Sequence, residues 1–163
     1  MSIEIREFCK EDVGQMIEIW NEVVKEGVAY PQTELLDEES GLALFERQSF
    51  TGVAVDTVSK EVLGLYILHP NNIGRCGHIS NASYAVSSRA RGQKIGEKLV
   101  CDSIEQGKRL GFLILQFNAV VKSNEKALHL YEKLGFTRLG VIPKGFRMDD
   151  GSYEDIVPHY KML

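Results

Sequence analysis

The segment Tyr84–Gly96 combines the residue types that hold phosphate groups in proteins. A strand-like pattern ends at Val86, a short loop with glycine and basic residues follows, and an amphipathic helix pattern begins at Ile95. Backbone amides at the start of a helix carry partial positive charge and bind phosphate. Gly92 and Gly96 would let the backbone come close to a ligand. The spacing therefore predicts a diphosphate site between the strand and the helix.

The basic side chains of this loop have two interpretations. Arg89, Arg91 and Lys94 can add charge-assisted hydrogen bonds to a phosphate group. The alternative is a common strand-to-helix turn with solvated basic residues, and composition alone leaves both open. The loop has neither the GxxxxGK(S/T) pattern of a P-loop nor the GxGxxG pattern of a dinucleotide-binding fold.

Asn124 and Tyr131 lie about two helical turns apart in a segment with helical spacing, so their side chains share one face. A tyrosine hydroxyl is a neutral proton donor at pH 7, because its reference pKa is about 10. It can protonate a leaving thiolate within hydrogen-bond reach. The alternative is that Tyr131 is a core aromatic residue beside Leu128 and Leu134. An asparagine at a helix start is commonly a cap, and Asn124 can combine that role with a ligand contact.

The composition is that of a globular domain. The chain has 163 residues, enough for one domain with one core, so residues 1–163 are expected to form a single domain. Hydrophobic residues make up 44% and charged residues 26%. The net charge of −4, without a long basic run, argues against binding to nucleic acid or to an anionic membrane. No apolar stretch approaches the roughly 20 residues of a membrane span.

Cysteine usage indicates a reducing compartment. Cys9, Cys76 and Cys101 are odd in number and form no CxxC pair, which gives no disulfide framework and no metal site. We therefore expect a cytoplasmic protein without a metal cofactor. The charged segment Met1–Arg6 also lacks the apolar core of an export signal.

Hydrophobic periodicity and the positions of glycine and proline predict the elements that must position these residues. We expect helices over residues 11–26, 95–109 and 124–134, and a further helix from a Thr33 cap to about Gln48, with Ser40-Gly41 as a break. We expect strands over residues 3–8, 50–55, 62–68, 78–86, 112–121, 136–142 and 156–162. The apolar run of residues 112–121 is long enough for a strand buried on both faces. This order indicates a mixed α/β sheet with helices packed on it.

Two motifs make the sequence resemble the GNAT superfamily of N-acetyltransferases. The acetyl-CoA loop of that family follows the pattern (R/Q)-x-x-G-x-(G/A), which is matched here at Arg91 and Gly96. The sequence departs from the family at Lys94, where glycine is usual. The second motif, Asn124–Phe136, is similar to the family segment N-x-x-A-x-x-x-Y-x-x-x-G-F. The motifs occur in the family's order with a strand between them, and the resemblance extends from about Ile3 to the C-terminus.

The resemblance implies an α/β GNAT fold, in which a twisted, mixed and mostly antiparallel sheet has flanking helices and two splayed central strands. It also implies acetyl-CoA as co-substrate, with the pantetheine arm in the gap between those strands and hydrogen bonds from the backbone around Tyr84 and Val86. The acetyl-CoA-binding residues implied in this way are Tyr84, Val86, Arg91, Gly92, Gln93, Lys94, Ile95, Gly96, Asn124 and Tyr131.

The resemblance gives Tyr131 the position of the general acid but leaves the general base open. Many relatives have a glutamate about where this sequence has Asn81, and an amide cannot act as a base. Deprotonation of the amine would then use water or a remote group. His78, at the start of the same strand, is one candidate, although a structural role is more common for a lone histidine.

The segments around Asn81 and Asn118 are similar to segments of the azetidine-2-carboxylate (proline-analogue) N-acetyltransferases, in which two asparagines on the central strands help to bind and orient the substrate. An asparagine within an apolar strand is disfavoured, which supports a local role for both. The alternative is that each pairs with backbone exposed where the strands splay. We expect Tyr30 and the pair Phe146-Arg147 to border the acceptor pocket, where Arg147 either holds a substrate carboxylate or is solvated.

Three functions follow from these residues. The first is direct acetyl transfer to the amine of a small molecule, such as an amino acid or an analogue. The second is acetylation of a protein or peptide, and the third is a non-catalytic module that binds acetyl-CoA. The tyrosine at the acid position favours catalysis, and the absence of an appended recognition domain favours a small acceptor. Members of the family often dimerise, so a homodimer is a further expectation.

Overall fold

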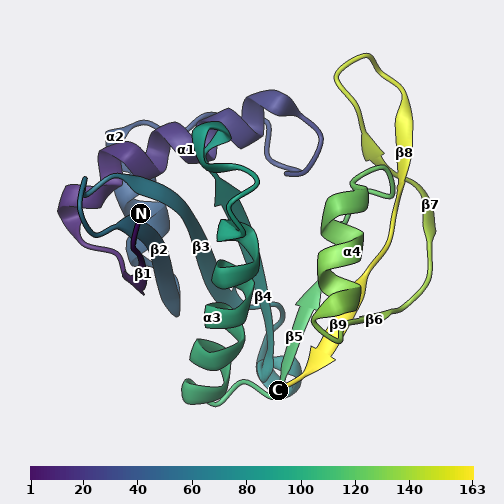
Figure 1. The fold of residues 1–163 in the computed structure, drawn as a ribbon. Helices are drawn as coiled ribbons and strands as arrows, with labels where there is room; N and C mark the ends of the chain where they lie inside the picture. The colour runs from purple at the N-terminus through teal and green to yellow at the C-terminus, as the bar shows by residue number, and fades with distance from the viewer.

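The computed structural model describes residues 1–163, which form a mixed sheet with helices on both faces (Figure 1). The helices are α1 (Val13–Glu26), α2 (Glu38–Glu46), α3 (Ile95–Arg109) and α4 (Glu125–Lys133). The strands are β1 (Ile3–Glu7), β2 (Phe50–Asp56), β3 (Val62–Pro70), β4 (Ile79–Val86), β5 (Ile114–Phe117), β6 (Thr137–Arg138), β7 (Ile142–Arg147), β8 (Tyr153–Ile156) and β9 (His159–Met162). The main sheet has the order β1-β2-β3-β4-β5-β9-β6, and β7 and β8 form a separate hairpin.

The core has two layers because the central strands alternate their side chains between the two faces. Leu65 of β3 packs in the cluster that contains Trp20 of α1 and Phe45 of α2. The next residue, Tyr66, packs on the other face with Leu99 of α3. In Figure 1, α1 and α2 accordingly lie on one side of the sheet and α3 on the other. None of the helices has the length and apolar character that crossing a bilayer requires.

The main sheet splays between β4 and β5. Strand β4 pairs with β3 antiparallel from Ser80 to Val86, along nearly its whole length. On its other side it pairs with β5 in parallel only at Ile79 and Ser80. From Asn81 onward, the β4 edge that faces β5 therefore has no strand partner. This arrangement confirms the predicted mixed, mostly antiparallel sheet with splayed central strands.

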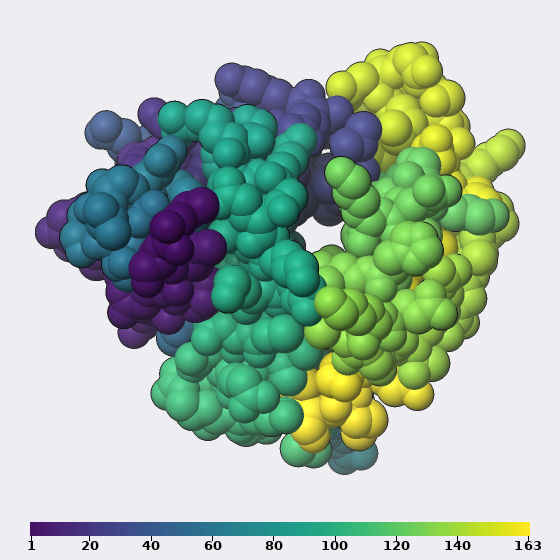
Figure 2. All heavy atoms as spheres, in the orientation of Figure 1, coloured from purple at the N-terminus to yellow at the C-terminus, as the bar shows by residue number.

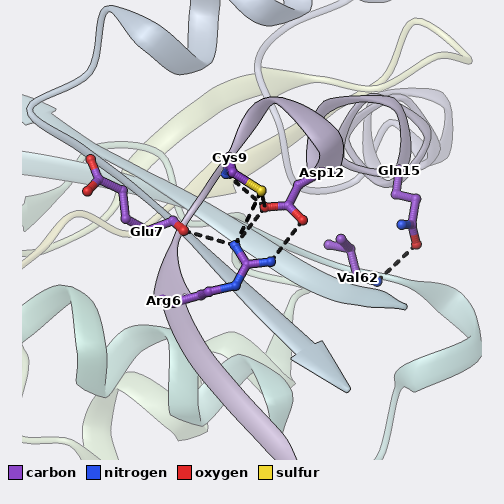
Figure 3. Close-up of polar contacts among 6 residues, drawn as sticks. All are labelled: Arg6, Glu7, Cys9, Asp12, Gln15 and Val62. Carbon is purple, nitrogen blue, oxygen red and sulfur yellow. Dashed lines mark hydrogen bonds and ion pairs between the residues drawn. The ribbon is translucent and has the colours of Figure 1, made fainter. Parts of the chain in front are cut away.

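Polar side chains tie α1 to the sheet (Figure 3). The Arg6 guanidinium forms two hydrogen bonds with the buried Asp12 carboxylate, at 2.7 and 3.0 Å. The same carboxylate accepts a hydrogen bond from the Cys9 amide at 2.8 Å. One turn later, the Gln15 side-chain oxygen accepts a hydrogen bond from the Val62 amide at 2.9 Å. These contacts fix the start of α1 against β1 and β3.

The second helix starts later than the sequence predicts. The sequence predicts a helix from Thr33, but α2 begins at Glu38 and Asp37 caps it. The Asp37 carboxylate accepts a hydrogen bond from the Ser40 amide at 2.8 Å, and the Ser40 hydroxyl accepts one from the Asp37 amide at 2.9 Å. This capping box makes Ser40 part of the helix start, not a break. Gly41 continues the helix, and its lack of a side chain makes room for α1, since a Cβ there would lie 2.5 Å from the Ile17 side chain.

The C-terminal third contains more strands than the sequence predicts. The apolar run of residues 112–121 forms a strand only over β5, because the chain leaves the sheet after Phe117. The two expected strands of residues 136–142 and 156–162 are four, namely β6, β7, β8 and β9. The hairpin of β7 and β8 lies outside the main sheet and shares a small core of Val121, Phe146 and Ile156.

Candidate active site

The turn between β4 and α3 presents a run of backbone amides without an acceptor in the chain. The amides of residues Gly92 to Glu97 form no backbone hydrogen bond, whereas the Lys98 amide donates to the Lys94 carbonyl. Gly92 has φ +78°, a conformation that favours glycine. A Cβ at Gly96 would come no closer than 3.8 Å to a neighbouring atom, so the backbone there is open. Free amides at a helix start form a site for an anion.

The Lys94 backbone explains why glycine is usual at this position in the family that the motif resembles. Lys94 precedes the first residue of α3 and has φ +60° in the left-handed region. That conformation costs a residue with a Cβ roughly 1–2 kcal/mol. Its ammonium group forms no ion pair in the chain, whereas Arg89 pairs with Glu61 at 3.0 Å. Lys94 is therefore the unpaired cation of the loop.

Arg91 points from the loop toward α1. Its guanidinium forms an ion pair with Glu26 and lies 3.9 Å from Glu22. Glu22 also accepts a hydrogen bond from the Ser88 amide at 2.7 Å. Two carboxylates of α1 thus hold the first half of the loop and leave the amides after Arg91 free. The spacing of Glu22 and Glu26 by one helical turn places them on one face of α1, but no motif in the sequence links them to the loop.

A cleft of about 390 Å³ lies at the splay between β4 and the segment after β5. Figure 2 shows the molecule hollowed between the teal segment of α3 and β4 and the green segment of α4. The cleft brings together five of the predicted site residues, which are distant in the sequence: Asn81, Tyr84, Asn118, Asn124 and Tyr131.

Tyr131 reaches the cleft from α4 through a cluster of aromatic rings. Its ring centroid lies 4.4 Å from that of Phe117, 5.5 Å from that of Phe136 and 5.7 Å from that of His159. Burial raises the pKa of Tyr131 above the usual value for tyrosine. The phenol therefore keeps its proton at neutral pH. The ring thus packs in a core, as one of the two interpretations predicts, and the residue also lines the cleft.

Tyr84 and Val86 lie on the β4 edge that has no strand partner toward β5. The Tyr84 hydroxyl is 2.7 Å from the Ser103 hydroxyl of α3, which fixes the ring across the floor of the cleft. Burial, followed by the nearby Tyr131 hydroxyl, raises the pKa of Tyr84 well above its usual value. Val86 pairs with Gly64 on β3, and its side chain does not line the cleft.

The asparagines of the cleft form hydrogen bonds across the splay. The Asn81 amide nitrogen donates to the Gln116 carbonyl at 2.8 Å, which is the backbone pairing that the sequence left as an alternative. Asn118 donates to the Asn71 side-chain oxygen at 2.6 Å and accepts from the Gln116 amide group at 3.0 Å. Asn124 caps α4, since its side-chain oxygen accepts from the Ala127 amide at 3.3 Å.

A second cavity of about 740 Å³ adjoins the cleft, between the loop after α1 and the β7–β8 hairpin. Tyr30 lines both spaces, and Phe146 and Arg147 line the larger one, so these three residues lie together. Lys25 and Asp149 are the other charged residues of the cavity. None of the three charged side chains forms an ion pair in the chain, which leaves them free to contact a ligand.

His69, which no sequence motif singles out, is the histidine of the cleft. It lies near the end of β3, opposite Asn81 of β4 in the antiparallel ladder. The predicted alternative, His78, is exposed and does not line the cleft. The sequence pattern of β3 does not distinguish His69 from the residues around it. Only the pairing register of β3 with β4 shows that His69, and not His78, lies beside Asn81. No group of three or more His, Cys, Asp or Glu residues is placed to bind a metal.

Comparisons with known proteins agree with this geometry. The model of the acetyltransferase (GNAT) family matches residues 15–136. The chain is 38% identical over 87 residues to the N-acetyltransferase aca1 of Schizosaccharomyces pombe, a match that covers 53% of this chain and 42% of that protein. The chain thus spans less than half the length of that relative.

Solved structures share the whole fold. The structure of a GCN5-related N-acetyltransferase from Kribbella flavida has a TM-score of 0.90 and 32% identity, with 99% of this chain and 98% of that chain covered. The structure of a GNAT superfamily phosphinothricin acetyltransferase from Sinorhizobium meliloti, in complex with acetyl-CoA, has a TM-score of 0.91. It is 21% identical, and 100% of this chain and 89% of that chain are covered, so this likeness concerns the fold alone.

Proposed function

Because the chain belongs to the acetyltransferase (GNAT) family, we propose that it is an acetyl-CoA-dependent N-acetyltransferase that acts directly on the amine of a small molecule. The observation that carries this proposal is the run of free amides from Gly92 to Glu97, at one end of a splayed gap that is lined further along by Tyr131. The amides suit a diphosphate, and the phenol suits a leaving thiolate.

The residues of the turn and the gap fit a coenzyme. The amides of Gly92, Gln93, Lys94, Ile95 and Gly96 hold the diphosphate, and the Lys94 ammonium adds the positive charge that Arg91, paired with α1, does not. The unpaired backbone edge near Tyr84 and Val86 binds the pantetheine amides, as an added strand would, and Asn124 contacts the arm. Acetyl-CoA, when bound, supplies the acetyl group as a reactive thioester.

The side chains of the cleft divide the remaining work. Tyr131 holds a proton at its hydroxyl oxygen, where it acts as the general acid for the departing thiolate. Asn81 and Asn118 orient the acceptor between the two central strands, because both line the cleft and present amide groups there. The aromatic cluster around Tyr131 fixes the position of its ring.

The second cavity supports an amino acid or an analogue as the acceptor. Arg147 of β7 and Lys25 of α1 line the cavity without an ion pair, and a guanidinium is well suited to a carboxylate. Tyr30 lies at the junction of the two spaces. An acceptor whose carboxylate contacts Arg147 would lie near this junction, with its amine directed toward the cleft that Tyr131 lines.

A screen for release of the CoA thiol tests this function. The purified chain is supplied with acetyl-CoA and with L-amino acids, azetidine-2-carboxylate, phosphinothricin, polyamines or short peptides. We expect turnover with one or more of the acceptors that carry both an amine and an acid group. Turnover on peptides alone would replace the small acceptor with a protein acceptor. Binding of acetyl-CoA without turnover on any amine would favour a non-catalytic module.

A further inference from the structure

The cleft contains a single side chain of the type that ordinarily gains or loses a proton near neutral pH. No Asp, Glu, Lys, Arg or Cys residue lines it, and its titratable residues are His69 and the three tyrosines Tyr30, Tyr84 and Tyr131. Burial raises the pKa of each tyrosine, so all three keep their protons at neutral pH. Histidine is the residue whose charge changes in that range. His69 is thus the proton acceptor that the cleft offers.

A hydrogen bond at His69 determines which ring nitrogen is free. The Nδ1 atom lies 2.9 Å from the Pro70 carbonyl oxygen. A carbonyl only accepts hydrogen bonds, so Nδ1 carries the proton of the neutral ring. The lone pair of the ring is then on Nε2. The hydrogen bond thus favours the tautomer in which Nε2 can accept a proton.

The position of His69 in the sheet places its side chain next to that of Asn81 in the cleft. The two residues are Cα partners in the β3–β4 ladder. Side chains directly opposite in an antiparallel pair project from the same face, with Cβ atoms about 4.5–5.5 Å apart. The Asn81 amide is engaged with the Gln116 carbonyl and has no proton-accepting role. The neighbouring strand therefore supplies the basic group.

We propose that His69 is the general base that deprotonates the acceptor, an inference that rests on the proposed N-acetyltransferase function. Nε2 takes a proton from the ammonium group of the acceptor, so that one N–H bond of the ammonium breaks and an Nε2–H bond forms. The amine keeps the electron pair and becomes neutral, as acyl transfer requires. The imidazolium then gives its proton to water, and the base is restored. Transfer is direct or through one water molecule.

The test compares His69→Gln with a matched control, His78→Gln. His78 is exposed and outside the cleft, so its loss leaves the chemistry untouched. Release of the CoA thiol is recorded between pH 6 and pH 10 with an L-amino acid that the wild type acetylates. We expect His69→Gln to lower kcat/KM for the acceptor about 10²-fold or more near neutral pH. The loss shrinks at alkaline pH, where the acceptor arrives already neutral.

The shape of the pH profile separates catalysis from structure. In His69→Gln, kcat/KM rises tenfold per pH unit until the acceptor amine itself is neutral, whereas in the wild type and in His78→Gln it depends less steeply on pH. The melting temperature and the Kd for acetyl-CoA stay at the wild-type values, and His69→Asn gives the same profile. An unchanged profile in His69→Gln, or an equal loss at every pH, would overturn the assignment. A wild type that acetylates no amine would contradict the proposed function instead.

Discussion

His69 of β3 and Asn81 of β4 stand directly opposite each other in the antiparallel ladder, and both line the cleft at the splay of the sheet. The amide and the imidazole differ in chemistry, because only the imidazole can accept a proton near neutral pH. Asn81 instead joins β4 to the Gln116 carbonyl across the splay. Asn81 therefore cannot serve as a base, whereas His69 carries the group that the proposed proton transfer needs.

Replacing Tyr131 with phenylalanine removes the proposed acid and keeps the aromatic packing. We expect turnover to fall by about 10²-fold or more, while the Kd for acetyl-CoA changes little. The ring still packs on Phe117, at a centroid distance of 4.4 Å in the wild type, so the fold is retained. Steady-state kinetics and calorimetry on the same preparation make the comparison. Unchanged turnover would remove Tyr131 from the chemistry.

A charge swap distinguishes two roles for Arg91. Arg91→Glu breaks the ion pair with Glu26 and repels Glu22, so we expect weaker binding of acetyl-CoA. Because the guanidinium points toward α1, the double variant Arg91→Glu/Glu26→Arg restores the pair and should restore most of the affinity. Melting temperatures should change little, since exposed ion pairs contribute about 0–1 kcal/mol. Failure of the swap to restore binding would indicate that the Arg91 charge acts on the coenzyme itself.

Lys94 offers a test in which stability and affinity move in opposite directions. Lys94→Gly relieves the left-handed backbone at φ +60° and should raise the free energy of unfolding by about 1 kcal/mol. The same change removes the unpaired cation of the loop and should weaken acetyl-CoA binding. Lys94→Ala is the matched control, because it removes the charge but keeps the strained backbone. Equal stability of the two variants in urea denaturation would contradict this account of the loop.

The sequence predicts α3, α4 and the turn between β4 and α3, because these features depend on local signals. Amphipathic spacing defines both helices, and Gly111 and Gly135, with φ +87° and +86°, follow their ends. The length of β5 has no such signal, since the apolar run continues to Val121 after its hydrogen-bond partners end. His69 has no local signal either, because its place in the cleft depends on a cross-strand register.

The Arg6–Asp12 pair should make stability depend on pH in the acid range. Burial opposes ionisation of Asp12, but the hydrogen bonds from Arg6 and the Cys9 amide outweigh it and leave the pKa of Asp12 below its usual value. A lowered pKa means that the stabilisation is complete above the unfolded value of about 3.9 and is lost as the pH falls through the folded value.

Asp12→Asn is the variant that isolates this effect. At pH 7 we expect it to lower the free energy of unfolding by about 1–3 kcal/mol, because the Arg6 guanidinium and the Cys9 amide lose their charged acceptor. Below pH 4 the gap between variant and wild type should narrow. Urea denaturation at several pH values measures it, and a gap that stays constant from pH 7 to pH 3 would assign the loss to packing.

Titration of acetyl-CoA into the wild-type chain in a calorimeter most directly tests whether the free amides of residues 92–97 bind the coenzyme. We expect saturable heat with one coenzyme bound per chain. We also expect weaker binding of pantetheine, which lacks the diphosphate that we propose the free amides hold. Absence of heat with millimolar acetyl-CoA, on folded protein, would contradict the proposed enzyme.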